Sequence, residues 1–164
     1  LEDTFNVSIG QGGLRQSPLR MACFAASLAR RETRTRPTLL HQEPSSRIDH
    51  GGDPIGLQSE HYDALAEGMR KSASIGTARR VKVDGVAIAG KTGTGQWRNN
   101  NMKLNVAWFI GFAPVNKPEV AVAVLVEGIV PQDNIQGGLT ATPVAQKMLQ
   151  AYFDKKNKNL AVNR

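Results

Sequence analysis

The sequence predicts an α+β fold in which helices cover an antiparallel sheet. Three observations lead to this prediction. Apolar residues recur with helical spacing in three segments of the 164-residue chain. Two apolar segments in its second half, residues 105–113 and 119–128, have the composition of strands. The connection between them, residues 114–118, is too short for the crossover that a parallel pair requires, so the two strands are expected to form a hairpin.

The first predicted helix begins at Ser17 and Pro18. Serine is a favoured N-cap residue, and proline is well tolerated at the first helical position. Four apolar residues then recur at positions i, i+3, i+4 and i+7, which predicts one core-facing stripe: Met21, Phe24, Ala25 and Leu28. Residues 30–37 are expected to end the helix.

Residues 41–56 are rich in Pro, Ser, Gly and Asp, which is typical of a linker. They include potential metal ligands: His41, Glu43, Asp49, His50 and Asp53. The spacing of these residues matches no helical histidine pair, and a metal site needs fixed geometry. We therefore expect a solvated linker and no metal.

A second helix is predicted from Ser59, with Lys71 near its C-terminus and His61 facing solvent. Its expected core-facing side carries Tyr62, Leu65, Ala66 and Met69. The pattern changes after Gly76 to one typical of strands.

The first expected strand carries Val81, Val83, Val86 and Ile88 and leads into residues 90–95, which are followed by a polar loop at residues 98–101. Residues 120–126 carry no polar side chain on either face of a strand, which predicts burial on both sides of the sheet. Helices are therefore expected on both faces. Trp108 should be a core residue, and Trp97 should border a groove.

The last predicted helix begins with Thr142 as its cap and Pro143 in its first turn. Its apolar stripe comprises Ala141, Val144, Ala145, Met148, Leu149 and Tyr152. The chain becomes polar from Asp154, so we expect the helix to fray there and residues 155–164 to be flexible.

Composition excludes several classes of protein. The 21 Lys and Arg against 14 Asp and Glu give a net charge of +7, but the excess is clustered and no aromatic residues interleave with it, so nucleic acid is not expected as a partner. The longest apolar runs are far shorter than the ~20 residues that span a bilayer. Cys23 is the single cysteine, which excludes an intrachain disulfide. The chain starts at Leu1 and has no signal peptide, so we expect it to be a piece of a longer protein.

Residues 85–92 match the phosphate-binding expression G-x-x-x-x-G-K-[ST]. A working P-loop needs an apolar strand before its first glycine and a helix that opens at the lysine. Here residues 79–84 are largely polar, and the glycines and asparagines after Lys91 are poor helix formers. Nucleotide binding therefore remains an unfavoured alternative, which a helix after Lys91 would support.

The same lysine can be interpreted as part of a strand, Lys91-Thr92-Gly93-Thr94. Side chains alternate along a strand, so both threonine hydroxyls would point to one face. A lysine ammonium and hydroxyls suit the recognition of a carboxylate. Gly93 would let a substrate backbone approach closely, and the Thr94 amide could donate to a developing oxyanion.

Further motifs accompany this tetrapeptide in a fixed order. They are I-G-Q-G at 9–12, S-P-L at 17–19, G-M at 68–69, G-T-A at 76–78, A-G-K-T-G-T-G-Q at 89–96, A-W-F-I-G-F-A-P at 107–114 and G-G at 137–138. Together they resemble the transpeptidase domain of class B penicillin-binding proteins, most closely the penicillin-binding protein 2 subgroup. The resemblance covers most of the chain and implies a penicillin-binding protein/β-lactamase-like fold.

The resemblance implies that Lys91, Thr92, Gly93 and Thr94 line the active-site strand. Lys91 would support the electrostatics around the nucleophile and the substrate carboxylate, which the hydroxyls of Thr92 and Thr94 would hold. The Thr94 amide would supply half of the oxyanion hole. The implied reaction is acyl transfer by a serine to peptidoglycan stem peptides on the outer side of the cytoplasmic membrane, with β-lactams as suicide substrates and no cofactor.

Two family motifs are missing. No serine has a lysine three residues later, as the S-x-x-K nucleophile motif requires, and S-x-N is absent too. We therefore expect residues 1–164 to be the C-terminal portion of a single transpeptidase domain, inactive alone, with the remainder of that domain and cell-wall elongation proteins as partners. A further departure is Arg31, where the family tends to have glycine, so that turn is expected to differ. The alternative is a non-enzymatic module that binds a peptide or polyanion.

Overall fold

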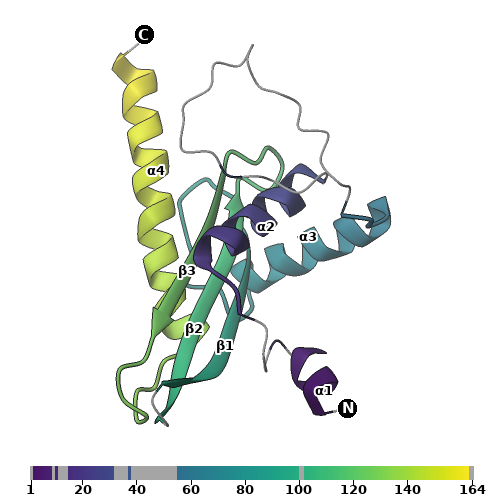
Figure 1. Cartoon of the computed structure of the whole chain (residues 1–164). Coiled ribbons are helices and arrows are strands. Elements are labelled where there is room, and N and C mark those ends of the chain that lie inside the picture. Colours follow the sequence, from purple (N-terminus) through teal and green to yellow (C-terminus); the bar gives the residue numbers. More distant parts are fainter. Residues whose placement is uncertain are drawn as a thin grey trace.

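The computed structural model of the chain describes residues 2–8, 10, 15–31, 37, 55–99 and 102–162 (Figure 1). Its helices are α1 (Glu2–Ser8), α2 (Pro18–Arg30), α3 (Ser59–Ser74) and α4 (Thr142–Val162), and a π-helical turn, Gly137–Ala141, precedes α4. The strands are β1 (Ala89–Asn99), β2 (Met102–Ala113) and β3 (Val120–Glu127). The predicted α+β class is confirmed.

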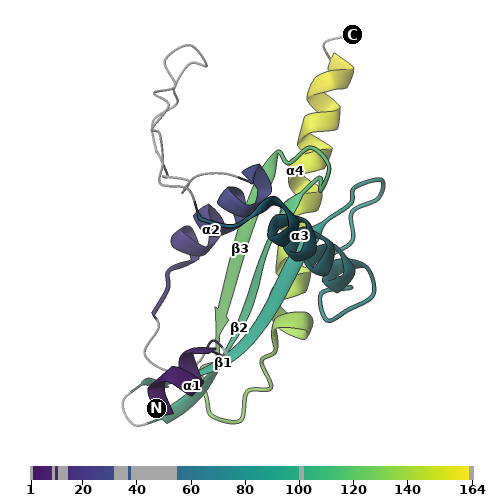
Figure 2. The same ribbon diagram turned by 90° about the vertical axis from the view of Figure 1, so that its right-hand side faces the viewer.

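The three strands form one antiparallel sheet in the order β1-β2-β3. The predicted hairpin is the β2–β3 pair, in which Phe109 lies opposite Val124. Helix α2 packs on β2 and β3 and α3 packs beside β1, whereas α4 packs on the opposite face (Figures 1 and 2). Helices therefore cover both faces of the sheet, as the apolar composition of β3 predicts.

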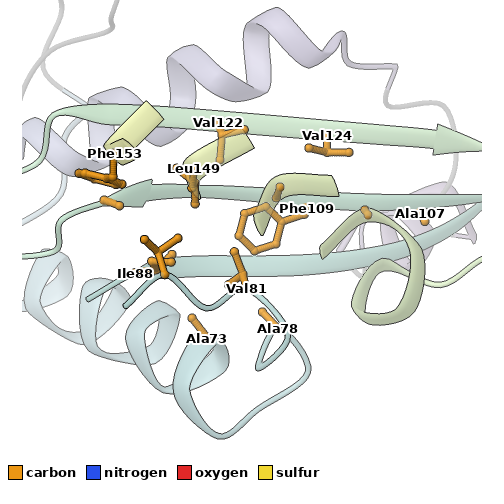
Figure 3. Packing of buried hydrophobic residues seen from close by; sticks show 14 residues of the cluster. Ala73, Ala78, Val81, Ile88, Ala107, Phe109, Val122, Val124, Leu149 and Phe153 are labelled. Atoms are coloured by element: carbon orange, nitrogen blue, oxygen red, sulfur yellow. The ribbon is translucent and has the colours of Figure 1, made fainter. Parts of the chain in front are cut away.

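The larger core lies between the sheet and α4. Phe109 is fully buried at its centre, with Leu149 above it and Val81 beside it (Figure 3). Burying a side chain of this size is worth about 1.5–3 kcal/mol relative to leaving it exposed. A smaller cluster on the other face joins α2 and α3 to the sheet: Leu28, Tyr62, Met69, Ala89 and Phe112.

The predicted strand through Val81 and Ile88 is wrong. Val83 and Val86 form an isolated bridge around a turn in which Gly85 has φ +73°, and β1 begins only at Ala89. Val81 and Ile88 are nevertheless buried in the core. The apolar spacing therefore reports burial of a turn-rich segment, because alternation alone does not reveal that the chain reverses at a glycine.

The predicted start of α2 is confirmed, since the Ser17 hydroxyl accepts a hydrogen bond from the Arg20 backbone N–H at 3.3 Å. The predicted buried faces are only partly correct. In α2, Ala25 and Leu28 are buried but Phe24 is 44% exposed, and in α3 Leu65 is 43% exposed. Both helices contact the described part of the chain through a narrower stripe than the sequence indicates.

The predicted face of α4 is shifted. Its buried apolar residues recur every fourth position, at Ala145, Leu149 and Phe153, and they continue the line of Ala141 in the preceding π-helical turn. Val144, Met148 and Tyr152 are exposed. Thr142 is not an N-cap, because it has helical backbone angles and its hydroxyl donates to the Gly137 carbonyl at 2.9 Å. The π-helical turn already starts the helix, which then continues to Val162 through the tail that was expected to fray.

Three smaller predictions can be compared with the structure. Arg31 adopts the left-handed cap conformation, with φ 57°, so the turn does not differ from a glycine-capped one. Residues 98 and 99 of the predicted loop belong to β1, which ends at Asn99, and β2 begins at Met102. Trp108 is half-buried, whereas Trp97 is exposed. Within the described residues, no helix is long and apolar enough to cross a membrane.

Candidate functional site

The segment Lys91-Thr92-Gly93-Thr94 lies in the middle of β1, an edge strand of the sheet. It pairs with β2 so that Lys91 is opposite Ile110 and Thr94 is opposite Ala107. The chain remains a strand from Ala89 to Asn99, so no helix opens at the lysine. A phosphate-binding loop requires that helix, and the P-loop alternative is therefore rejected.

Lys91 and the two threonines project to opposite faces of β1. Lys91 is exposed, and its ammonium donates a hydrogen bond to the carbonyl of Thr92. The cation is therefore folded back along its own strand. A carboxylate that approaches this edge would compete with the neutral carbonyl of Thr92. A hydrogen bond between an ammonium and a carboxylate is the stronger of the two, because both partners are charged.

Thr92 is buried, with 8% of its surface exposed. Its hydroxyl lies 2.7 Å from the Thr77 hydroxyl, in the turn that follows α3. Thr94 is exposed, and its hydroxyl accepts a hydrogen bond from the Gly137 backbone N–H at 3.2 Å. The two threonine hydroxyls thus share one face of the strand, as alternation predicts, and each is held by a residue from another segment.

The π-helical turn before α4 packs closely against the backbone of this strand. A Cβ on Gly137 would lie 2.6 Å from the carbonyl oxygens of both Gly93 and Trp108, and one on Gly138 would lie 2.4 Å from the Thr77 carbonyl oxygen. No side chain fits at either position. The paired glycines therefore let α4 begin in direct backbone contact with β1 and with the Thr77 turn.

Two glycines of β1 have different surroundings. A Cβ on Gly90 would lie 2.5 Å from the Phe109 ring, so packing requires glycine there. A Cβ on Gly93 would make only an ordinary contact, 3.4 Å from the Trp108 Cβ. Packing within the described chain therefore does not explain the glycine between the two threonines.

No cluster of three His, Cys, Asp or Glu residues that could hold a metal occurs among the described residues. The potential ligands of the predicted linker, from His41 to Asp53, lie outside those residues. Sequence reasoning assigned no role to Thr77 or to the contact between Gly137 and Gly93. The ordered motifs G-T-A and G-G were the signal that could have found them.

Residues 2–150 match the sequence profile of the penicillin binding protein transpeptidase domain. The chain belongs to this family. A relative in this family, the peptidoglycan D,D-transpeptidase MrdA of Acinetobacter baumannii, is 28% identical over 181 residues, which cover 96% of this chain and 25% of the relative. The peptidoglycan D,D-transpeptidase PbpA of Mycobacterium tuberculosis is 31% identical over 150 residues, which cover 88% of this chain and 30% of the relative.

Solved penicillin-binding proteins share the fold. The crystal structure of PBP2 from Pseudomonas aeruginosa superposes with a TM-score of 0.69 and 34% identity, covering 92% of this chain and 32% of that one. PBPA from M. tuberculosis superposes with a TM-score of 0.70 and 30% identity, covering 89% of this chain and 34% of that one. The resemblance to class B, penicillin-binding protein 2-like transpeptidase domains is thus confirmed, and the chain spans about a quarter to a third of these relatives.

Proposed function

We propose that this chain is the part of a longer serine-type peptidoglycan D,D-transpeptidase that carries the K-T-G strand, which is β1 with its segment Lys91-Thr92-Gly93-Thr94. The observation that carries the proposal is the placement of Lys91-Thr92-Gly93-Thr94 on an edge strand, with Lys91 and Thr94 exposed. An exposed strand edge can bind an extended peptide through its backbone. The reaction is acyl transfer between stem peptides on the outer side of the cytoplasmic membrane, and it needs no cofactor.

In this proposal each residue of the strand has a separate role. Lys91 supplies positive charge to the nucleophile and to the terminal carboxylate of the peptide. The hydroxyls of Thr92 and Thr94 hold that carboxylate from the other face of the strand, and the Thr94 amide donates to the oxyanion. Gly93 leaves room for the substrate backbone, and the packing within the chain does not itself require a glycine at this position.

The nucleophile and its base must come from elsewhere, because the sequence contains neither S-x-x-K nor S-x-N. Without a nucleophile, an acyl enzyme cannot form, whereas binding to the strand is retained. We therefore propose that the chain alone is inactive and that its partner is the remainder of the transpeptidase domain. A relative of this chain, PBPA from M. tuberculosis, has been solved as a ceftriaxone acyl-enzyme complex, which supports β-lactams as ligands of the complete domain.

Labelling with a fluorescent penicillin tests both parts of this proposal. The full-length protein is expected to give a covalent band that survives denaturation, and the 164-residue chain is expected to give none. A stoichiometric adduct on the chain alone would contradict its inactivity. If the full-length protein is not labelled, and its strand binds peptide without turnover, a non-enzymatic binding module is the better interpretation.

A further inference from the structure

The Gly76-Thr77-Ala78 turn has no part in the function proposed above, yet it contributes the hydroxyl that contacts the active-site strand. Thr77 lies three residues beyond the end of α3 and is exposed, while its partner Thr92 is buried. Their hydroxyl oxygens are 2.7 Å apart, which is a full hydrogen bond in which either atom can be the donor.

The backbone on both sides of Thr77 is fixed. The Gly76 N–H donates to the Lys71 carbonyl and the Ala78 N–H donates to the Ser72 carbonyl, each at 3.0 Å. The carbonyl of Thr77 itself lies against Gly138, where a Cβ would come within 2.4 Å. Thr77 is therefore held between α3, the π-helical turn and β1, and its hydroxyl is directed at Thr92 by the fold.

The number of protons determines what this contact can do. Each threonine hydroxyl has one proton to donate and can also accept. If the Thr92 hydroxyl donates a hydrogen bond to the carboxylate of a substrate, its only proton is in use. The hydrogen bond between the two hydroxyls must then be donated by Thr77. A hydroxyl that accepts a hydrogen bond becomes a better donor, because hydrogen bonds in a chain polarise one another.

We propose that Thr77 is a positioning residue of the carboxylate site, which donates to Thr92 and thereby directs the Thr92 proton to the substrate. This inference rests on the proposed function of the K-T-G strand. No proton is transferred between residues: the two hydroxyls rotate, and the hydrogen bond between them takes one direction when a carboxylate is bound. Without Thr77, the buried Thr92 hydroxyl loses the partner that fixes its orientation.

The test uses the full-length protein and two β-lactams, benzylpenicillin and its methyl ester, which differ in the carboxylate. The second-order rate of acylation is measured with each. The wild-type protein is expected to prefer the acid. In Thr77→Val, which keeps the volume and removes the hydroxyl, acylation by the acid is expected to fall about threefold to tenfold, the range for one lost hydrogen bond. Acylation by the ester should change little.

Two matched variants and a double-mutant cycle serve as controls. Thr77→Ser keeps the hydroxyl and should restore the preference for the acid. Ser74→Ala removes an exposed hydroxyl that bonds to the Lys71 carbonyl in the same region, and it should leave both rates unchanged. The double variant with Thr77→Val and Thr92→Val should lose no more of the acylation rate with the acid than Thr92→Val alone, because both changes break the same pair of hydrogen bonds. If Thr77→Val does not fold, Thr77→Ala and the serine variant provide the same comparison.

The possible failures are distinguishable. If Thr77→Val keeps the wild-type preference for the acid, the Thr77 inference is wrong while the proposed function stands. If both rates fall equally, Thr77 only stabilises the fold, and the inference is again wrong. If the wild-type protein is not acylated, or does not discriminate between acid and ester, the proposed role of the K-T-G strand fails first.

Discussion

Gly137 lies directly against the peptide backbone of Gly93, at the centre of the K-T-G strand. A Cβ on Gly137 would come within 2.6 Å of the Gly93 carbonyl oxygen and 3.0 Å of its nitrogen. These neighbours are backbone atoms of a paired strand, so they cannot move away alone. The contact couples the start of α4 to the strand that carries Lys91 and the two threonines.

Gly137→Ala is therefore expected to displace this strand or the π-helical turn. Overpacking of this kind costs about 1–3 kcal/mol. The variant of the full-length protein should unfold at lower urea concentration and should be acylated more slowly by a β-lactam. Gly68→Ala is the matched control, since its Cβ would meet no atom within 4 Å. An unchanged acylation rate in Gly137→Ala would show that the strand tolerates the displacement.

Gly93→Ala separates a functional requirement for glycine from a packing requirement. Its Cβ would lie 3.4 Å from the Trp108 Cβ, so the expected loss of stability is small. Acylation should nevertheless fall, because in the proposed site the new methyl group would occupy the space through which a substrate backbone approaches. Gly90→Ala is the opposite case: its Cβ would lie 2.5 Å from the Phe109 ring, so urea denaturation should show the loss. Equal effects of the two variants on stability would contradict this distinction.

The arrangement around Lys91 could be predicted from sequence because it depends on local chemistry. Gly93 and Gly95 after the lysine disfavour a helix, and alternation places Thr92 and Thr94 on one face. The contacts from Thr77 and Gly137 could not be predicted in this way. They come from segments 15 and 43 residues away from their partners, and only tertiary packing brings them together.

The errors in the helices have a common physical origin. Helical periodicity identifies an apolar sector, but the described contacts cover only part of that sector. In α4 the predicted stripe includes both Met148 and Leu149, and the sheet covers only the second. The turn at Gly85 was missed for a related reason, since valines that pack into a core look alike in a strand and in a turn.

Leu149→Ala and Met148→Ala test the orientation of α4. Leu149 is 1% exposed beside Phe109, whereas Met148 is 51% exposed. Truncation of a buried leucine costs about 2–5 kcal/mol, while a surface change is usually within about 0.5 kcal/mol. In urea denaturation of the full-length protein, Leu149→Ala should lower the midpoint and Met148→Ala should leave it unchanged. A larger effect at Met148 would mean that α4 is rotated from this orientation.

Glu67 is expected to titrate at unusually low pH. The side-chain hydrogen bond from Arg70 is the main reason that its pKa falls from 4.5 to about 2, and the bond from Lys71 adds to this effect. Because the folded pKa lies below the unfolded one, the stabilising effect is complete above pH 4.5 and is lost as pH falls towards 2. NMR titration of the Glu67 carboxyl should show this, and Arg70→Gln should raise the pKa more than Lys71→Gln does. If the two variants raised the pKa of Glu67 equally, the low pKa would result from the nearby positive charges and not from the hydrogen bond with Arg70.

Lys91→Ala is expected to lower the rate of β-lactam acylation of the full-length protein by more than tenfold. The attraction between an ammonium and a carboxylate at 4 Å is about 4 kcal/mol at an effective dielectric of 20, and desolvation removes part of it. A factor of ten corresponds to about 1.4 kcal/mol, so even a third of that attraction accounts for the loss. The exposed Lys103 on β2 is a matched control, and Lys103→Ala should leave the rate unchanged. Because Lys91 is exposed, its removal should not alter the urea midpoint, and a wild-type acylation rate in Lys91→Ala would remove the lysine from the site.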